Sequence, residues 1–259
     1  MSSKSKSLAT AASGAKTGTV VIAQPQVLSV ALEVAGTADL IQNCYSQKSI
    51  EQMLRNHMGI SVQREKKKPR ESIENATIRN IAGAVCVSPL AFKGAMLAAS
   101  ATLKALKKTQ LRTGLFVEGA SIPITFAEMK PRMDMVRTSG IGRKPDVRFR
   151  PSFIDWKARM VIQFSDVLTV QTVVDLLNRA GSVGVGEWRP EKNGVYGTFR
   201  VSRNITDTAE IRDLRTACAV PLVTPVIPEW ALDADIDPEM LAKIFDDHAR
   251  SNGASEAEA

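Results

Sequence analysis

The feature that most constrains the fold is a strand–helix–strand pattern in residues 156–201. In WKARMVIQF, apolar side chains alternate with polar ones over residues 158–164, as they do in a strand with one buried face. TVQTVVDLLNRAG then has the 3.6-residue apolar period of a helix, with Thr169 as its N-cap and Gly181 as its stop. VYGTFRV predicts a second strand. This order predicts an α+β fold with a ferredoxin-like or RRM-like βαβ core.

The polar face of the two predicted strands carries four residues that suit a nucleic-acid partner. If the apolar faces pack on the helix, the open face of the sheet presents Lys157, Arg159, Tyr196 and Arg200. Basic side chains attract phosphates, and an aromatic ring can stack on a base. We therefore expect an open, basic platform on this sheet.

Between the predicted helix and the second strand lies a glycine-rich, basic loop, GSVGVGEWRPEKNGVYG. Glycine permits close backbone approach, so N–H groups of the loop can face a phosphate while Arg189 and Lys192 add positive charge. Trp188 or Tyr196 can stack on a base. The alternative is a β-bulge and turn in which Trp188 belongs to the core and Arg189 is a surface charge. The loop is not a dinucleotide fingerprint, because those glycines precede a helix rather than follow one.

Charge is distributed unevenly along a chain whose net charge is +7. Residues 103–150 contain eleven basic and four acidic residues, so this middle part alone carries +7. From residue 228 onward, nine acidic residues face two basic ones. A basic middle predicts a polyanionic partner, and a merely solvated surface is the alternative. The acidic end can dock on a neighbouring copy or shield an empty binding surface.

Two elements of the basic middle are predicted to present its charge. A helix is expected from Pro89, with Ser88 as its N-cap, and it continues through a lysine-rich stretch. Four lysines would share one face of this helix: Lys93, Lys104, Lys107 and Lys108. Residues 127–153 contain three prolines, two glycines and little periodicity. A connection of that length is usually functional or disordered, and we predict an extended basic hairpin, a thumb-like finger.

Composition sets the domain organisation. Residues 1–18 predict a disordered arm, residues 19–220 a single α+β nucleic-acid-binding domain, and residues 221–259 an acidic C-terminal extension with a helix. The extension contains Asp233, Asp235, Asp237 and Glu239, which lack the glycine and spaced glutamate of a calcium loop and are predicted to form a solvated linker.

No apolar run is long enough for a transmembrane helix. Three widely spaced cysteines form no zinc or disulfide pattern, which predicts the cytoplasm.

The segment GVGEWRPEKNGVYGTFRV resembles a signature shared by a family of mostly uncharacterised bacteriophage proteins. The matching residues are Gly184, Gly186, Trp188, Arg189, Pro190, Gly194, Gly197 and Phe199. SPLAFKGAMLAA and RFRPSFIDWKARMVIQF also resemble segments of those proteins.

More distantly, the layout resembles the RAMP superfamily, the ferredoxin-like RNA-binding subunits of CRISPR effectors. Those proteins carry a glycine-rich loop between a late helix and strand, and their backbone subunits carry a long basic hairpin. Phe92-Lys93-Gly94 resembles their lysine–glycine segment. The resemblance implies sequence-independent binding of single-stranded RNA or DNA, by a protein that oligomerises along the strand and is phage-encoded.

Three interpretations of function are open. The first is a nucleic-acid-binding protein that coats single strands as a homo-oligomer or filament. The second is a virion or assembly protein whose finger and acidic end bind neighbouring copies. The third is a metal-independent RNase of the RAMP type with His57 as general base.

We favour the first interpretation and predict a protein with no enzymatic activity, cofactor, metal or membrane partner. Its predicted location is the cytoplasm of the cell or phage host. The predicted nucleic-acid-binding residues are Lys104, Lys107, Lys108, Arg112, Arg132, Arg137, Arg143, Lys144, Arg148, Arg150, Lys157, Arg159, Gly184, Gly186, Trp188, Arg189, Lys192, Tyr196 and Arg200.

Overall fold

The computed structural model describes residues 26–58, 66–103, 106–137 and 145–228. The predicted disordered arm lies outside the described residues, as do Lys104, Arg143 and Lys144. The same holds for most of the acidic extension, including its predicted helix. Residues 221–228 are described, and they lie beside residues 79–81, where the Ile81 N–H donates to the Pro221 carbonyl at 2.9 Å.

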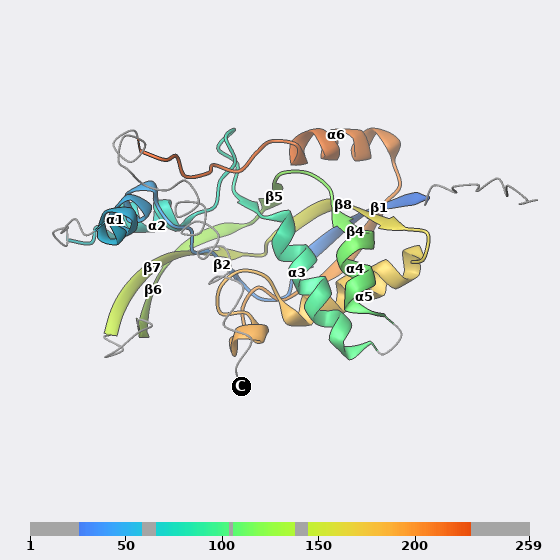
Figure 1. Ribbon diagram of the computed structural model, residues 1–259, viewed down its shortest axis with the longest axis horizontal. Helices are drawn as coiled ribbons and strands as arrows, with labels where there is room; N and C mark the ends of the chain where they lie inside the picture. The colour runs from blue at the N-terminus through green and yellow to red at the C-terminus, as the bar shows by residue number, and fades with distance from the viewer. Residues whose placement is uncertain (1–25, 59–65, 104–105, 138–144, 229–259) are drawn as a thin grey trace, which may run out of the picture.

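The larger of two antiparallel sheets forms the centre of an α+β fold (Figure 1). Its strands run in the order β3 (Cys86–Val87), β5 (Ile122–Thr125), β8 (Lys157–Ser165), β1 (Val27–Gly36) and β9 (Phe199–Ile205), and β4 (Leu115–Val117) also pairs with β8. Helices α3 (Pro89–Ala99) and α5 (Val170–Val183) cover one face. Helix α6 (Thr208–Cys218) lies over the opposite face.

The core lies between this sheet and helices α3 and α5. On β1, Leu32 and Val34 are fully buried and pair in register with Met160 and Ala158 of β8, which are buried too. Phe92 of α3 meets Phe199 of β9 edge-on, with ring centroids 5.6 Å apart. The apolar residues at the period-two positions of β8, residues 158, 160, 162 and 164, are all buried, as the sequence predicts. Val161 on the opposite face is buried as well, so burial does not alternate strictly.

A second sheet joins a long hairpin to the rest of the molecule. Strands β6 (Glu128–Arg137) and β7 (Pro145–Ile154) pair along their whole length, and β2 (Leu40–Ile41) pairs with the base of β7. Helices α1 (Gln47–His57) and α2 (Pro69–Ala76) lie beside this hairpin at one end of the molecule (Figure 1). The extended hairpin predicted for residues 127–153 is therefore present.

The long lysine-faced helix predicted from Pro89 is wrong. Helix α3 ends at Ala99, a short 3-10 turn follows at Ser100–Thr102, and a separate helix, α4 (Lys108–Gly114), begins at the last lysine. The Ser100 hydroxyl donates to the Leu97 carbonyl at 2.7 Å, and the Thr102 hydroxyl donates to the Ala99 carbonyl at 2.8 Å. These side chains compete for the acceptors that a continuing helix would use. Lys93 and Lys108 therefore belong to different helices.

The second predicted strand begins four residues later than the alternation indicates. Strand β9 starts at Phe199, and Val195, expected to face inward, is 69% exposed. Gly197 has φ +68°, and a Cβ there would lie 1.8 Å from the Val185 carbonyl oxygen. The chain must therefore turn at Gly197, and residues 195–198 belong to the glycine loop rather than to the strand. Helix α5 likewise runs past Gly181 to Val183, and Gly184 is its C-cap.

Over the described ranges, no helix combines the length and apolar character needed to cross a membrane. The same residues contain no group of three or more His, Cys, Asp or Glu side chains that could hold a metal ion.

Candidate nucleic-acid interface

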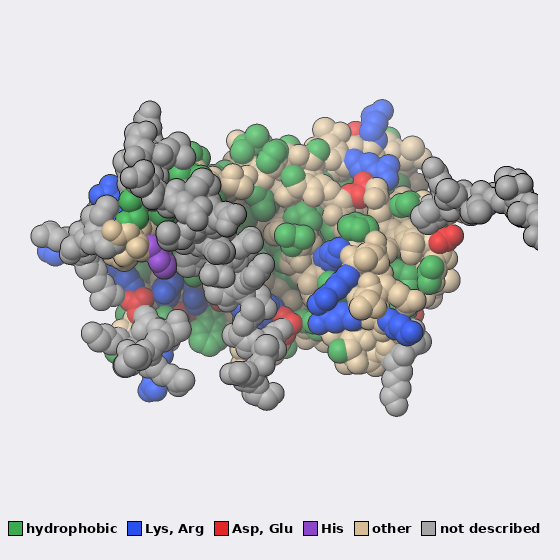
Figure 2. Space-filling model, viewed as in Figure 1, with side chains coloured by type: hydrophobic (Ala, Val, Ile, Leu, Met, Phe, Trp, Pro, Cys, Tyr) green, Lys and Arg blue, Asp and Glu red, His purple; other side chains and the backbone are tan. Residues whose placement is uncertain are grey.

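A groove of about 570 Å³ lies between α3, α4 and the glycine loop. Its basic side chains are Lys108 and Arg112 from α4 and Arg189 from the loop, and we call it the basic groove. Figure 2 shows Lys and Arg side chains gathered over α3 and α4 on this side of the molecule. Five of the sequence-predicted binding residues line this groove: Lys108, Arg112, Gly184, Gly186 and Arg189.

Small residues of α3 form the floor of the basic groove. Ala91, Gly94, Ala95 and Ala98 all line it, and they recur at the three- and four-residue spacing of one helix face. A Cβ added at Gly94 would meet nothing within 4 Å. Helix α3 is capped by Ser88, whose hydroxyl accepts from the Leu90 N–H at 3.2 Å. The floor leaves room for a backbone to lie close to the helix.

The two cations of α4 are available to a ligand. Lys108 and Arg112 are four residues apart, share one helix face and are exposed. Among the described residues, neither has a carboxylate within ion-pair distance. The Lys93 ammonium group donates to the Arg112 carbonyl at 3.0 Å and lies 4.2 Å above the centre of the Phe116 ring. Lys93 thus links α3 to α4 and holds the two sides of the groove together.

Arg189 is positioned by its own loop. Its Nε donates to the Glu191 carboxylate at 2.7 Å, and its Nη1 donates to the Gly186 carbonyl at 3.1 Å. Both side chains of the ion pair are about one-fifth exposed. Arg189 therefore contributes a fixed but partly neutralised charge to the basic groove.

Many main-chain donors of the glycine loop already have protein acceptors. The Glu187 N–H donates to the Ile41 carbonyl at 2.9 Å, and the Gly197 N–H donates to the Asp39 carbonyl at 2.8 Å. The Tyr196 N–H donates to the Trp188 carbonyl at 3.0 Å. Trp188 is 37% exposed at φ +53°, so it is not the core residue of the alternative interpretation. These hydrogen bonds shape the loop and are unavailable to a phosphate.

Most basic residues of the hairpin form ion pairs with acidic residues of the same hairpin. Arg132 Nε donates to Asp134 at 2.6 Å, and Arg150 lies 3.4 Å from the same carboxylate. Arg132 also donates to the Tyr196 hydroxyl at 2.7 Å and stacks 4.6 Å above that ring. Partial burial acts to lower the pKa of the Arg132 guanidinium, but its hydrogen bonds to Asp134 and Tyr196 outweigh this effect and raise the pKa. The contacts between Arg132 and Tyr196 fasten the glycine loop to the hairpin.

A second ion-pair cluster lies further along β7. Asp146 binds both Lys67 and Arg148, the latter at 3.0 Å. Burial acts to raise the pKa of the Asp146 carboxyl, but hydrogen bonds from Lys67 and Arg148 outweigh it and lower the pKa. Arg137 is exposed at the end of β6.

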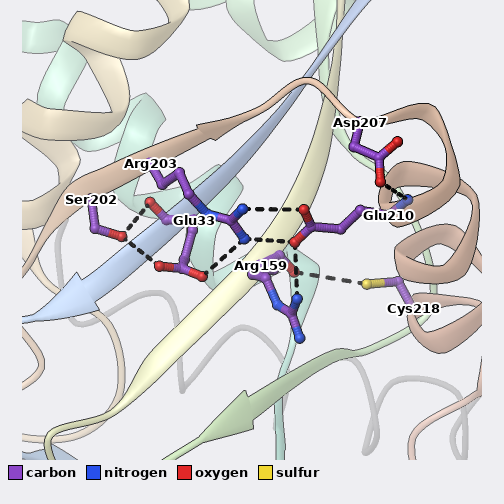
Figure 3. A network of polar contacts seen from close by, with 7 residues as sticks. All are labelled: Glu33, Arg159, Ser202, Arg203, Asp207, Glu210 and Cys218. Atoms are coloured by element: carbon purple, nitrogen blue, oxygen red, sulfur yellow. Dashed lines mark hydrogen bonds and ion pairs between the residues drawn. The ribbon is translucent and has the colours of Figure 1, made fainter.

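The open sheet platform expected from the sequence is wrong in its geometry, because α6 lies over that face. Glu210 of α6 accepts from Arg159 at 3.1 Å and from Arg203 at 2.6 Å, and Arg203 also lies 3.6 Å from Glu33 (Figure 3). Hydrogen bonds from Arg203 and then Arg159 lower the pKa of the Glu210 carboxyl. We call these four residues the α6 network.

The other platform residues are dispersed. Lys157 is exposed and lines a separate cleft beneath α6, and Arg200 is exposed on β9. Tyr196 belongs to the glycine loop rather than to β9. Lys107 precedes α4 at the N-cap position without a side-chain capping hydrogen bond, and Lys192 ends the short 3-10 turn Pro190–Lys192. His57 is exposed at the end of α1.

Sequence reasoning missed the floor of the basic groove. Ala91 and Ala98 carry no charge, and although they lie in the quoted segment SPLAFKGAMLAA they were not predicted to bind a ligand. A glycine within a predicted helix, Gly94, was the available signal, because it costs helix stability unless the backbone there needs room.

No protein-family model and no curated protein matches this chain. The resemblance to bacteriophage proteins therefore finds no support in these comparisons. Among solved structures, the cryo-EM structure of the Type III-B Cmr-beta bound to cognate target RNA is similar to this chain, with a TM-score of 0.42 and 10% sequence identity. The similarity covers 69% of this chain and 60% of the other, so this chain spans less than two thirds of the protein it matches.

Proposed function

We propose that this protein binds single-stranded RNA or DNA without regard to sequence and that the strand lies in the basic groove. The observation that carries the proposal is the placement of Lys108 and Arg112 on one side of a small-residue floor, with Arg189 on the other side. Phosphates attract exposed Lys and Arg side chains, and the floor admits the sugar–phosphate backbone.

Sequence independence follows from the lining of the basic groove. Its described lining has no Asn or Gln side chain, the types that read the edge of adenine in pairs of hydrogen bonds. The cations on its walls bind phosphates, which are the same for every sequence. Leu90, which lines the groove and is 74% exposed, offers an apolar contact to any base.

We further propose a ferredoxin-like core for the domain. The chain order β1, α3, β4 with β5, β8, α5, β9 supports it, since the sheet places β9 beside β1, β1 beside β8, and β8 beside β4 and β5. All these pairings are antiparallel. The hairpin β6–β7 is then an insertion between the second and third strands of that core.

Self-association along the strand is part of the proposal, and so are a phage origin and a location in the cytoplasm of the host. The outer half of β6 supports contacts between copies, because Met133 and Met135 on one face of the strand are 66% and 76% exposed. The same observation favours the second candidate, an assembly protein that binds neighbouring copies. A protein that assembles without nucleic acid would support that candidate instead.

The proposed activity is binding without a chemical step. An RNase that uses His57 as general base is the competing proposal, and it predicts strand cleavage that His57→Ala abolishes while affinity is kept. Binding without cleavage by both proteins supports the proposal made here.

The test places a negative charge in the basic groove without disturbing the fold. Gly94 faces open space, so Gly94→Glu introduces a carboxylate beside the expected phosphates, whereas Gly94→Ala adds only a methyl group. Binding of a fluorescent single-stranded oligonucleotide is measured by anisotropy. We expect Gly94→Glu to lose about tenfold or more in affinity and Gly94→Ala to keep most of it. Equal affinity of the two variants would mean that the strand does not lie in the basic groove.

A further inference from the structure

A second cleft, of about 400 Å³, is lined by residues of α1, α2 and β7. The two helices lie beside the hairpin at one end of the molecule (Figure 1). Four amide side chains line this cleft, and we call it the amide cleft: Asn43, Gln52, Asn56 and Asn75. We propose that the amide cleft binds one unstacked nucleobase of the bound strand. This inference rests on the proposed function, since it assigns a second point of contact to the same ligand.

The helices turn a polar face toward the amide cleft. Along α1 the lining residues are Ser49, Gln52, Met53 and Asn56, which follow the spacing of one helix face. The adjacent face of α1 holds the buried residues Ile50 and Leu54. Helix α1 therefore packs through its apolar side and leaves its amides directed at the cleft.

The amides of the cleft differ from a structural amide nearby. Gln42 is 2% exposed, donates to the Cys86 carbonyl at 2.8 Å and accepts from the Ile78 N–H at 2.8 Å. In the described part of the chain, none of the four cleft amides has a hydrogen-bond partner. Their donors and acceptors are thus free for a ligand, whereas those of Gln42 are used by the fold.

The chemistry of the lining fits a base better than a phosphate or a metal. Each amide offers two N–H donors and a carbonyl acceptor, which match the alternating donors and acceptors on base edges. Tyr45 and Phe149, both half-buried, add aromatic rings on which a base can stack. Rotation of an amide exchanges its donor and acceptor, so the cleft tolerates different bases. Its volume lies in the usual range of small-ligand sites.

The charges at the mouth of the cleft suit the backbone that carries the base. Lys67 and Arg148 both line the cleft and share one carboxylate, that of Asp146. Two cations against one anion leave a positive mouth for a phosphate. The hairpin bearing Arg148 also contacts the glycine loop through Arg132 and Tyr196, and other residues of that loop line the basic groove.

The experiment separates the base from the phosphate. The double substitution Asn56→Ala and Asn75→Ala removes two exposed amides, and Asn204→Ala on β9 is the control. Each protein is titrated with fluorescent oligodeoxyadenylate and with an abasic oligomer of equal length. We expect the double variant to lose about tenfold in affinity for oligodeoxyadenylate and nothing for the abasic strand, with an unchanged salt dependence. Equal losses for both strands, or no loss, would overturn the inference.

A second measurement does not depend on strand binding. Adenosine monophosphate is added to the wild-type protein, and the side-chain amide signals of Asn and Gln are followed by NMR. We expect shifts in signals that are assigned to Asn56 and Asn75 by their loss in the double variant. If a strand binds but neither this shift nor the affinity difference occurs, the inference fails and the proposed function stands. If no strand binds but the nucleotide shifts these signals, the proposed function fails and the site remains.

Discussion

The basic groove and the α6 network contain the same residue types and offer opposite properties to a ligand. In the groove, Lys108 and Arg112 are exposed and have no carboxylate partner among the described residues. In the network, Arg159 and Arg203 share the Glu210 carboxylate (Figure 3). A count of basic residues along the sequence cannot tell these surfaces apart.

The hairpin extends the comparison, because two of its cations share a carboxylate that is itself buried. Asp134 and the Arg150 side chain are each only 7% exposed, and Arg132 shares the same carboxylate. Burial of an ion pair carries a desolvation cost that close contact must offset. The difference teaches that the basic middle of the chain divides into residues that hold the fold together and residues that remain open to a polyanion.

The largest expected effect breaks the buried pair. Asp134→Ala leaves Arg150 buried without its carboxylate, and we expect a loss of about 3–5 kcal/mol in the free energy of unfolding. Urea unfolding followed by circular dichroism measures it. Glu128→Ala, which removes an exposed partner of Lys130 on the same strand, is the control and should change stability by less than about 1 kcal/mol. Small and similar losses of stability in both variants would mean that the hairpin cations do not hold the fold together and belong with the open cations of the basic groove.

A charge reversal in the basic groove should have the next largest effect. Arg112→Glu removes a phosphate contact and adds repulsion, so single-strand affinity should fall about 10- to 100-fold. Arg212→Glu makes the same change in charge on α6, beyond the opposite face of the sheet, where Arg212 is 78% exposed. Anisotropy titrations at fixed salt should show little loss for this control. Equal losses for the two variants would mean that net charge, and not the groove, governs binding.

A substitution that breaks the α6 network should change single-strand affinity by a smaller amount. Glu210→Gln removes the carboxylate that Arg159 and Arg203 share, so any latent anion site on the sheet face would become available. We expect single-strand affinity to rise by less than about threefold, because α6 still covers the face and exposed charges act weakly. A tenfold rise in the same titration would show that the sheet face competes with the groove.

The smallest expected effect is a dependence of stability on pH. The folded-state pKa of Asp146 is lowered, since Lys67 and Arg148 outweigh its burial, and that of Glu210 is lowered by Arg203 and Arg159. Such groups contribute stability above their unfolded pKa values of about 4, and the contribution is lost as pH falls through the lower folded values. Melting temperature should therefore be level from about pH 7 to pH 5 and fall below about pH 4. Asp146→Asn should flatten part of that fall.

Local patterns predicted much of the fold. Alternation in residues 158–164 corresponds to β8, the 3.6-residue period to α5, and the long irregular basic segment to the hairpin. Helix boundaries were less accessible, because the stop of α3 depends on hydroxyl groups of Ser100 and Thr102 that bond back to the preceding turn. The late start of β9 depends on a tertiary contact between Gly197 and Val185.

The candidate site was predicted in part. Gly184, Gly186 and Arg189 could be named from their loop, and Lys108 and Arg112 from their charge, and the fold brings them together. Which cations are neutralised could not be predicted, because Arg159 meets Glu210 across 51 residues of sequence and Arg132 meets Tyr196 across 64. The amide cleft was equally inaccessible, since its residues come from four separate segments.

The most direct test of the account is the salt dependence of single-strand binding by the wild-type protein and by the double variant Lys108→Ala and Arg112→Ala. The logarithm of affinity should fall linearly with the logarithm of salt concentration, with a slope of about −0.7 for each phosphate neutralised. Loss of two phosphate contacts should make that slope less negative by about 1.4. An unchanged slope, or no binding by the wild-type protein at low salt, would contradict the assignment of the basic groove as the nucleic-acid site.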